Sequence, residues 1–251
     1  MDFPVSLDLA IFLTGTFAAA FVTGLAGFAF GMVAASIWLF ALPPAQTTTL
    51  IVAYALLVQG YATWRLRDAI DYKRLLPFVL GSAIGIPAGV FMLEVVRPAY
   101  IRMAVGVLLI AFSLYNLTRP KFPETKSLGR AGDAGVGILN GVLGGSTGLG
   151  GILPVIWTTL RGWTRDQQRG VHQPTAFATF VMSLIALGGA GLMTPATTRL
   201  FLMGLPALVI GTVTGWALYG KLNEATFRKV VLILLLISGL AIVGTVHGLQ
   251  L

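Results

Sequence analysis

Long apolar stretches separated by short polar segments fill almost the whole chain. Each stretch has roughly 13 to 22 residues with few charged side chains, which is the length scale of helices that cross or enter a bilayer. The predicted segments are residues 8–25, 27–42, 46–64, 75–93 and 101–118 in the first half, and 132–145, 148–160, 172–193, 200–219 and 230–249 in the second. This pattern predicts an all-α polytopic membrane protein with five segments in each half.

Two segments of the second half, 132–145 and 148–160, have only about 14 and 13 residues. At 1.5 Å per residue they are too short to cross a hydrocarbon core about 30 Å thick. We interpret them as half-helices that meet at a glycine-rich break, and we expect the first two segments of both halves to be short or broken. The count is then eight to ten transmembrane segments, depending on whether each pair is fused.

A glycine motif marks this break in both halves. Gly24-Leu25-Ala26-Gly27-Phe28-Ala29-Phe30-Gly31 recurs in changed form as Gly141-Val142-Leu143-Gly144-Gly145-Ser146-Thr147-Gly148, with glycine at the first, fourth and eighth places. Interruptions at corresponding places of two halves are a pointer to the binding site of a transporter.

Further matches support an internal duplication. Residues 84–89 match 210–215 and Arg102 matches Arg228 at an offset of 126, whereas Gln46 matches Gln173 at 127 and the glycine motif repeats at 117. We therefore predict a first repeat at 1–118, a basic cytoplasmic linker at 119–131 and a second repeat at 132–251. The second repeat would have gained about ten residues between its break and Gln173.

Loop charges predict the orientation of the helices. The basic clusters are Arg65, Arg67, Lys73 and Arg74; Arg119, Lys121, Lys126 and Arg130; Arg161, Arg165 and Arg169; and Lys221, Arg228 and Lys229. By the positive-inside rule these four loops are cytoplasmic. The second and third clusters can share a side only if the two short segments between them cross twice or form a re-entrant pair. Five segments per half is an odd number, so the second repeat is predicted to be inverted, with both termini outside.

Composition narrows the function further. Of the 251 residues, 56% are hydrophobic and 10% are charged, whereas soluble domains have about 25% charged residues. The net charge of +8 is spread over short loops, so it fits helix orientation rather than nucleic-acid binding. The chain has no cysteine, no signal-peptide n-region, no metal-binding motif and no nucleophile–base pair near a break. We expect neither an enzyme nor a cofactor.

The candidate site consists of backbone and neutral polar groups, because the acidic residues, Asp133 among them, fall in or beside loops. The N-terminus of a half-helix offers unpaired N–H groups and a partial positive charge, which bind anions without a cationic side chain. Hydroxyl donors and the two glutamines, each opening the next helix, would complete the site. The predicted substrate-binding residues are Thr23, Gly24, Gly27, Gly31, Gln46, Asn140, Gly141, Gly144, Gly145, Ser146, Thr147, Gly148, His172 and Gln173.

Two of these features have alternative interpretations. The glycine spacing is also typical of close helix packing, and both roles can coexist. His172, predicted at the start of a helix, is either a polar cap or interfacial residue, or a substrate contact with a pH-sensitive role.

The chain resembles the TauE/SafE family of membrane proteins, described as sulfite or organosulfonate exporters. The resemblance covers essentially the whole length and is carried by Gly24-Leu25-Ala26-Gly27 with Gly31, by Asn140-Gly141 through Gly150-Gly151, and by the basic central loop. It implies export of a small sulfur-containing anion such as sulfite or sulfoacetate.

An anion channel, a carrier for another small organic anion and a membrane scaffold are the alternatives. The expected location is the inner membrane. The expected partners are the anionic substrate and the lipid bilayer, and a homodimer is left open.

Overall fold

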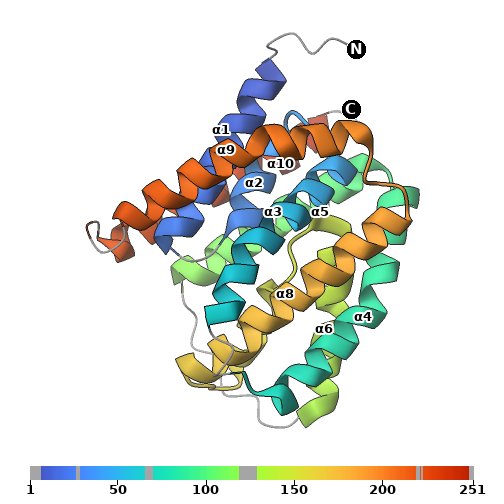
Figure 1. Cartoon of the computed structure of the whole chain (residues 1–251), viewed down its shortest axis with the longest axis vertical. Coiled ribbons are helices and arrows are strands. Elements are labelled where there is room, and N and C mark those ends of the chain that lie inside the picture. Colours follow the sequence, from blue (N-terminus) through green and yellow to red (C-terminus); the bar gives the residue numbers. More distant parts are fainter. Residues whose placement is uncertain are drawn as a thin grey trace. The chain divides into compact units, whose positions relative to one another are not determined.

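The computed structural model describes residues 7–26, 29–65, 70–118, 129–218, 221 and 223–248. These residues form ten α-helices and no strand (Figure 1). The helices are α1 (Leu7–Ala26), α2 (Phe30–Trp38), α3 (Pro44–Arg65), α4 (Tyr72–Val95), α5 (Pro98–Thr118), α6 (Gly129–Thr147), α7 (Ile152–Leu160), α8 (Arg165–Gly189), α9 (Pro195–Leu218) and α10 (Glu224–Gly248). Among them α1, α4, α5, α8, α9 and α10 contain stretches long and apolar enough to cross a membrane. The predicted all-α polytopic membrane fold is confirmed.

The two faces of α4 show why this helix suits a bilayer. One face exposes large apolar side chains, with Ile84 68% and Phe91 60% accessible. The other face carries small buried residues, including Gly81, Gly85 and Gly89. Small residues let helix backbones approach each other, while large apolar side chains tolerate contact with lipid but not with water.

The short helices are α2 and α7, with nine residues each. By contrast, α6 has 19 residues, or about 28 Å at 1.5 Å per residue. The prediction that residues 132–145 form a half-helix is therefore wrong. The helix begins earlier and continues through Gly141, Gly144 and Gly145, because packing against a neighbouring helix outweighs the low helix propensity of glycine.

The break of the second half lies at the end of the predicted motif. Gly148 and Gly151 have φ angles of +72° and +100°, which glycine adopts without the strain that a side chain would cause. They separate α6 from α7. In the first half, Ala29 (φ 77°) immediately precedes α2, while Gly27 lies outside the described residues.

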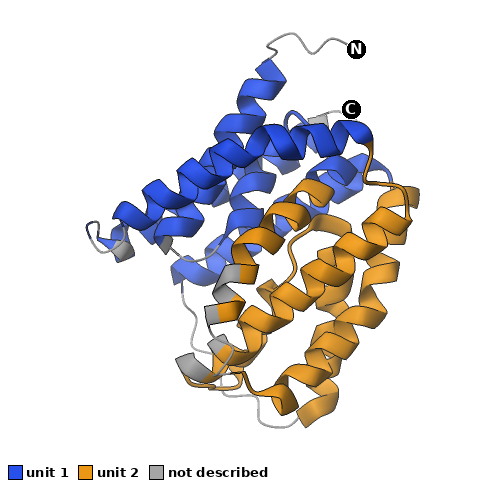
Figure 2. Cartoon of the chain, in the orientation of Figure 1, with its two compact units in different colours: residues 1–47, 97–120, 195–251 blue, residues 48–96, 121–194 orange. Residues whose placement is uncertain are grey.

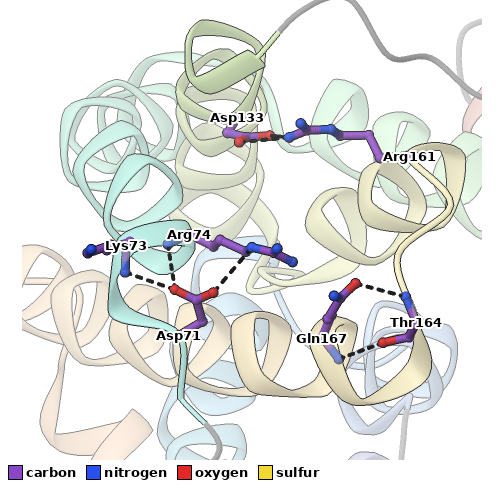
Figure 3. Close-up of polar contacts among 7 residues, drawn as sticks. All are labelled: Asp71, Lys73, Arg74, Asp133, Arg161, Thr164 and Gln167. Atoms are coloured by element: carbon purple, nitrogen blue, oxygen red, sulfur yellow. Dashed lines mark hydrogen bonds and ion pairs between the residues drawn. The ribbon is translucent and has the colours of Figure 1, made fainter.

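The start of α8 also differs from the prediction. A capping box joins Thr164 and Gln167, whose side chains accept each other's backbone N–H groups, so the helix begins at Arg165 instead of near residue 172 (Figure 3). Gln173 is consequently the ninth residue of α8 and does not open that helix. Gln46 is the third residue of α3, as predicted.

The helices form two compact units, and each unit combines segments from both halves of the sequence (Figure 2). Unit 1 contains residues 1–47, 97–120 and 195–251; unit 2 contains residues 48–96 and 121–194.

In unit 1, α1 packs against α9 and α5 packs against α10. The pair α1 and α9 is parallel, because Gly211 lies against the carbonyl group of Phe17 and Gly215 against that of Phe21. The pair α5 and α10 is antiparallel. Near its middle Gly106 meets Gly239, and near one end the Arg228 Nη2 donates to Asn116 Oδ1 at 2.7 Å.

In unit 2, α4 and α6 form the most extensive helix pair. They are parallel, with Gly85 against the carbonyl group of Ile138 and Gly89 against that of Val142. A Cβ atom at either glycine would overlap these carbonyl oxygens.

The glycine contacts establish a common register for the two units. Gly211 on Phe17 and Gly215 on Phe21 repeat the contacts of Gly85 on Ile138 and Gly89 on Val142. Helix α6 therefore corresponds to α1 at an offset of 121 (17 to 138), which pairs Gly24 with Gly145 instead of Gly141. The third residues of α3 and α8, Gln46 and Gln167, share this offset. The packing contacts thus suggest an alignment shifted by one helical turn from that of the motif, and the duplication itself stays a prediction.

Candidate functional site

The predicted site residues divide between the two units. Thr23, Gly24, Gly31 and Gln46 belong to unit 1, whereas Asn140, Gly141, Gly144, Gly145, Ser146, Thr147, Gly148, His172 and Gln173 belong to unit 2. The nine residues of unit 2 lie on α6, on α8 and in the break that follows α6.

In unit 2, α6 and α7 form a hairpin whose tip is the glycine break. Helix α7 folds back along α6, because Gly151 at its start contacts Asn140 while Trp157 near its end contacts Asp133. The first N–H groups of α7 point out of the helix at this tip, where no intrahelical carbonyl can accept them. Gly151 provides no side-chain cap for them.

Asn140 holds the tip together. It is fully buried, accepts the Gly151 N–H on Oδ1 at 2.6 Å, and donates from Nδ2 to Ser82 Oγ and Thr179 Oγ1, both at 3.1 Å. One amide group thereby links α6 to α4, α7 and α8. Both amide hydrogens are used within the protein, so Asn140 positions the site instead of offering donors to a ligand.

The hydroxyl groups of Ser146 and Thr147 are also used within the protein. They donate to the carbonyl oxygens of Val142 and Leu143, both at 2.7 Å. In this structure they are not the free donors that the sequence interpretation assigned to them.

Several motif glycines serve helix packing. A Cβ at Gly145 would lie 2.7 Å from the Ile86 carbonyl oxygen. One at Gly24 would lie 2.6 Å from that of Thr212, and one at Gly141 would lie 2.2 Å from that of Ser82. Gly144 faces α8, where a Cβ would lie 2.8 Å from the Thr179 methyl group. The packing interpretation is correct for Gly24, Gly141 and Gly145.

The polar residues of α8 occupy different positions. The side-chain oxygen of Gln173 accepts a hydrogen bond from Gln59 Nε2 of α3. The backbone carbonyl oxygen of Gln173 accepts one from Thr63 Oγ1 at 3.3 Å. His172 is the eighth residue of α8 and therefore not a helix cap. Its ring packs against Gly151, since a Cβ there would lie 3.2 Å from His172 Cε1.

An ionic cluster closes the base of the hairpin. Asp133, only 4% exposed, accepts hydrogen bonds from Arg161 Nη1 at 2.6 and 2.9 Å (Figure 3). It also accepts one from Trp157 Nε1 at 2.8 Å. The guanidinium groups of Arg161 and Arg74 lie 5.3 and 4.9 Å from the Trp163 ring centroid. Asp133 is the fifth residue of α6, near the start of that helix, and its burial against Arg161 was not predicted.

Sequence reasoning missed Ser82 and Thr179, the partners of Asn140, and the pairing of Asp133 with Arg161. Thr179 had a signal, because it follows His172 by seven residues and so shares its helix face. Neither Ser82 nor the Asp133–Arg161 ion pair had a signal in the sequence, because both depend on contacts between helices.

The apolar helices of membrane-spanning length indicate a multi-pass membrane protein. The family model for the sulfite exporter TauE/SafE matches residues 11–242. The chain belongs to this family. Comparisons with curated proteins and with solved structures found no match.

Proposed function

We propose that the protein exports a small sulfur-containing anion, such as sulfite, sulfoacetate or a related sulfonate, through a site at the tip of the α6–α7 hairpin. The observation that carries this proposal is the N-terminus of α7, which lies beside neutral polar groups of α6 and α8 in a member of the sulfite exporter family. A helix N-terminus attracts an anion through its N–H groups and its dipole.

The length of α7 supports a site deep in the membrane. Its nine residues span about 13 Å, roughly half of the hydrocarbon core. Arg161, which follows α7, belongs at the membrane surface by its charge. The N-terminus of α7 would then lie near the midplane, where transporters of broken-helix design place their substrates.

The orientation of the chain is part of the proposal. The hairpin brings Asp133 and Arg161 together, so the start of α6, with Arg130, and the basic segment after α7 lie at the same end of unit 2. The antiparallel pairing of α5 and α10, which carry the matched residues Arg102 and Arg228, supports inverted repeats. We accordingly place these basic segments in the cytoplasm, both termini outside, and the protein in the inner membrane.

The membrane potential is sufficient to drive this export. An inside-negative potential of about 100 mV favours the exit of a monoanion by about 2.3 kcal/mol, which corresponds to a concentration ratio of nearly fifty-fold. A uniporter therefore needs no side chain that carries protons. For the alternative of proton-coupled transport, His172 is the residue we name.

The test is anion flux in liposomes that contain the purified protein and an imposed potassium diffusion potential. We expect saturable sulfite or sulfonate flux that follows the potential. Replacing Gly144, Ser146 or Gln173 with leucine should abolish flux without loss of expression. Leucine at the exposed position Thr159 should leave the flux unchanged. Non-saturating flux would indicate a channel, and the absence of any anion flux would indicate a scaffold. Normal flux in all three leucine variants would reject the site.

A further inference from the structure

One face of α8 carries four polar side chains, three of which have a polar atom without a hydrogen-bond partner. His172, Thr175, Thr179 and Ser183 follow each other at intervals of three, four and four residues, which places them on one side of the helix. Thr175, Thr179 and Ser183 are all 0% exposed. Among the described residues, His172 Nδ1, Thr175 Oγ1 and Ser183 Oγ have no hydrogen-bond partner.

The Thr175 hydroxyl differs from those of the buried residues Thr16, Thr158 and Thr179, and shares its lack of a partner with the hydroxyl of Thr47 in unit 1. Thr179 donates to the carbonyl oxygen of Thr175, four residues earlier, at 2.8 Å. Thr16 and Thr158, also 0% exposed, make the same intrahelical bond at 2.7 and 2.8 Å. The Thr175 hydroxyl makes none. A buried hydroxyl without a partner is unfavourable, most of all where no water can reach it. A ligand that accepts a hydrogen bond from this hydroxyl would remove the cost.

His172 lies beside the start of α7, and Thr175 follows it by three residues along α8. A Cβ at Gly151 would be 3.2 Å from His172 Cε1 and 3.7 Å from Nδ1, and one at Gly150 would be 2.9 Å from the Thr179 methyl group. The polar face of α8 therefore runs along the tip of the hairpin. His172 and Thr175 are separated by less than one turn, a rise of about 4.5 Å, which one small oxyanion can bridge.

We propose that His172 Nδ1 and Thr175 Oγ1, together with the first N–H groups of α7, bind the –SO₃⁻ group of sulfite or a small sulfonate. This inference rests on the proposed function and assigns its anion to the donors of α8 instead of the hydroxyls of Ser146 and Thr147. The imidazole N–H, the hydroxyl and the helix N–H groups supply one donor direction for each of the three oxygens. Asn140 is the positioning residue that holds α7 beside α8.

The experiment is calorimetric titration of sulfite into the purified full-length protein and its variants, with thermal unfolding measured in parallel. In T175V the side chain keeps its shape and loses a hydroxyl that has no partner in the fold. We expect an unchanged or higher unfolding temperature and a sulfite affinity roughly ten- to a hundred-fold lower. His172→Phe should lower the affinity similarly, whereas His172→Asn, which keeps an N–H near the position of Nδ1, should retain part of it.

The matched control is T158V, which removes an equally buried hydroxyl that donates within α7. We expect it to bind sulfite like the wild type. Wild-type affinity in both T175V and His172→Phe would overturn this site while leaving the exporter function intact. A clear fall in the unfolding temperature of T175V would also overturn it, because the hydroxyl would then serve the fold. Failure of the wild type to bind sulfite or any small sulfonate would instead contradict the proposed function.

Discussion

At the scale of single residues, Asn140 shows how a polar side chain inside a membrane protein can be structural. Its amide makes three hydrogen bonds to groups on three other helices or helix ends, and none of its surface is exposed. In a bilayer the loss of such partners is costly, because water cannot replace them. The position of Asn140 beside the glycine motif therefore reflects the assembly of the tip.

We predict that Asn140→Ala destabilises the protein by on the order of 2–4 kcal/mol. The change removes three hydrogen bonds, leaves the Gly151 N–H without its acceptor and opens a cavity. Thermal or denaturant unfolding in detergent would measure this. Thr159→Ala, at an exposed site whose hydroxyl bonds only to its own helix, should change stability by less than about 0.5 kcal/mol. Equal unfolding midpoints for the two variants would contradict the structural role of Asn140.

At the scale of helices, the glycines of α4 and α6 determine how closely the two backbones approach. Gly85 and Gly89 face carbonyl groups of α6, and Gly137, Gly141 and Gly145 face the backbone of α4. These positions need glycine because the facing backbone leaves no room for a Cβ atom. Their backbone conformation is helical and would accept other residues. The same arrangement recurs in unit 1 between α1 and α9, where Gly211 and Gly215 face carbonyl groups of α1.

We predict opposite effects for two glycine-to-alanine substitutions in this pair. Gly85→Ala would force α4 away from α6 and lower stability by more than about 3 kcal/mol, or prevent folding. Gly135→Ala in α6 meets no atom within 4 Å and should raise stability by up to about 1 kcal/mol through helix propensity. Unfolding midpoints and the yield of monodisperse protein would compare the two. Similar behaviour of both variants would argue against the observed interface.

At the scale of the whole molecule, the orientation of the chain can be tested directly because it contains no native cysteine. Single cysteines at the exposed positions Lys73 and Thr164 should react with an impermeant maleimide only from the cytoplasmic side, and a cysteine at Met193 only from outside. Labelling of intact cells and of inverted vesicles would distinguish the sides. Lys73 and Thr164 on opposite sides would contradict inverted repeats and favour parallel ones.

The sequence by itself determined the ten helical segments, the membrane environment and the approximate positions of the breaks. These are local properties: a bilayer requires about 20 apolar residues for a span, and glycine clusters weaken a helix wherever they occur. Tertiary structure decided which glycines pack and which break the chain, since α6 continues through Gly141 to Gly145 only because α4 lies against it. It also determined which polar groups have hydrogen-bond or ionic partners. Asp133 meets Arg161, Asn140 meets Ser82 and Thr179, and Thr175 keeps an unpartnered hydroxyl, because those pairings depend on contacts between segments far apart in the chain.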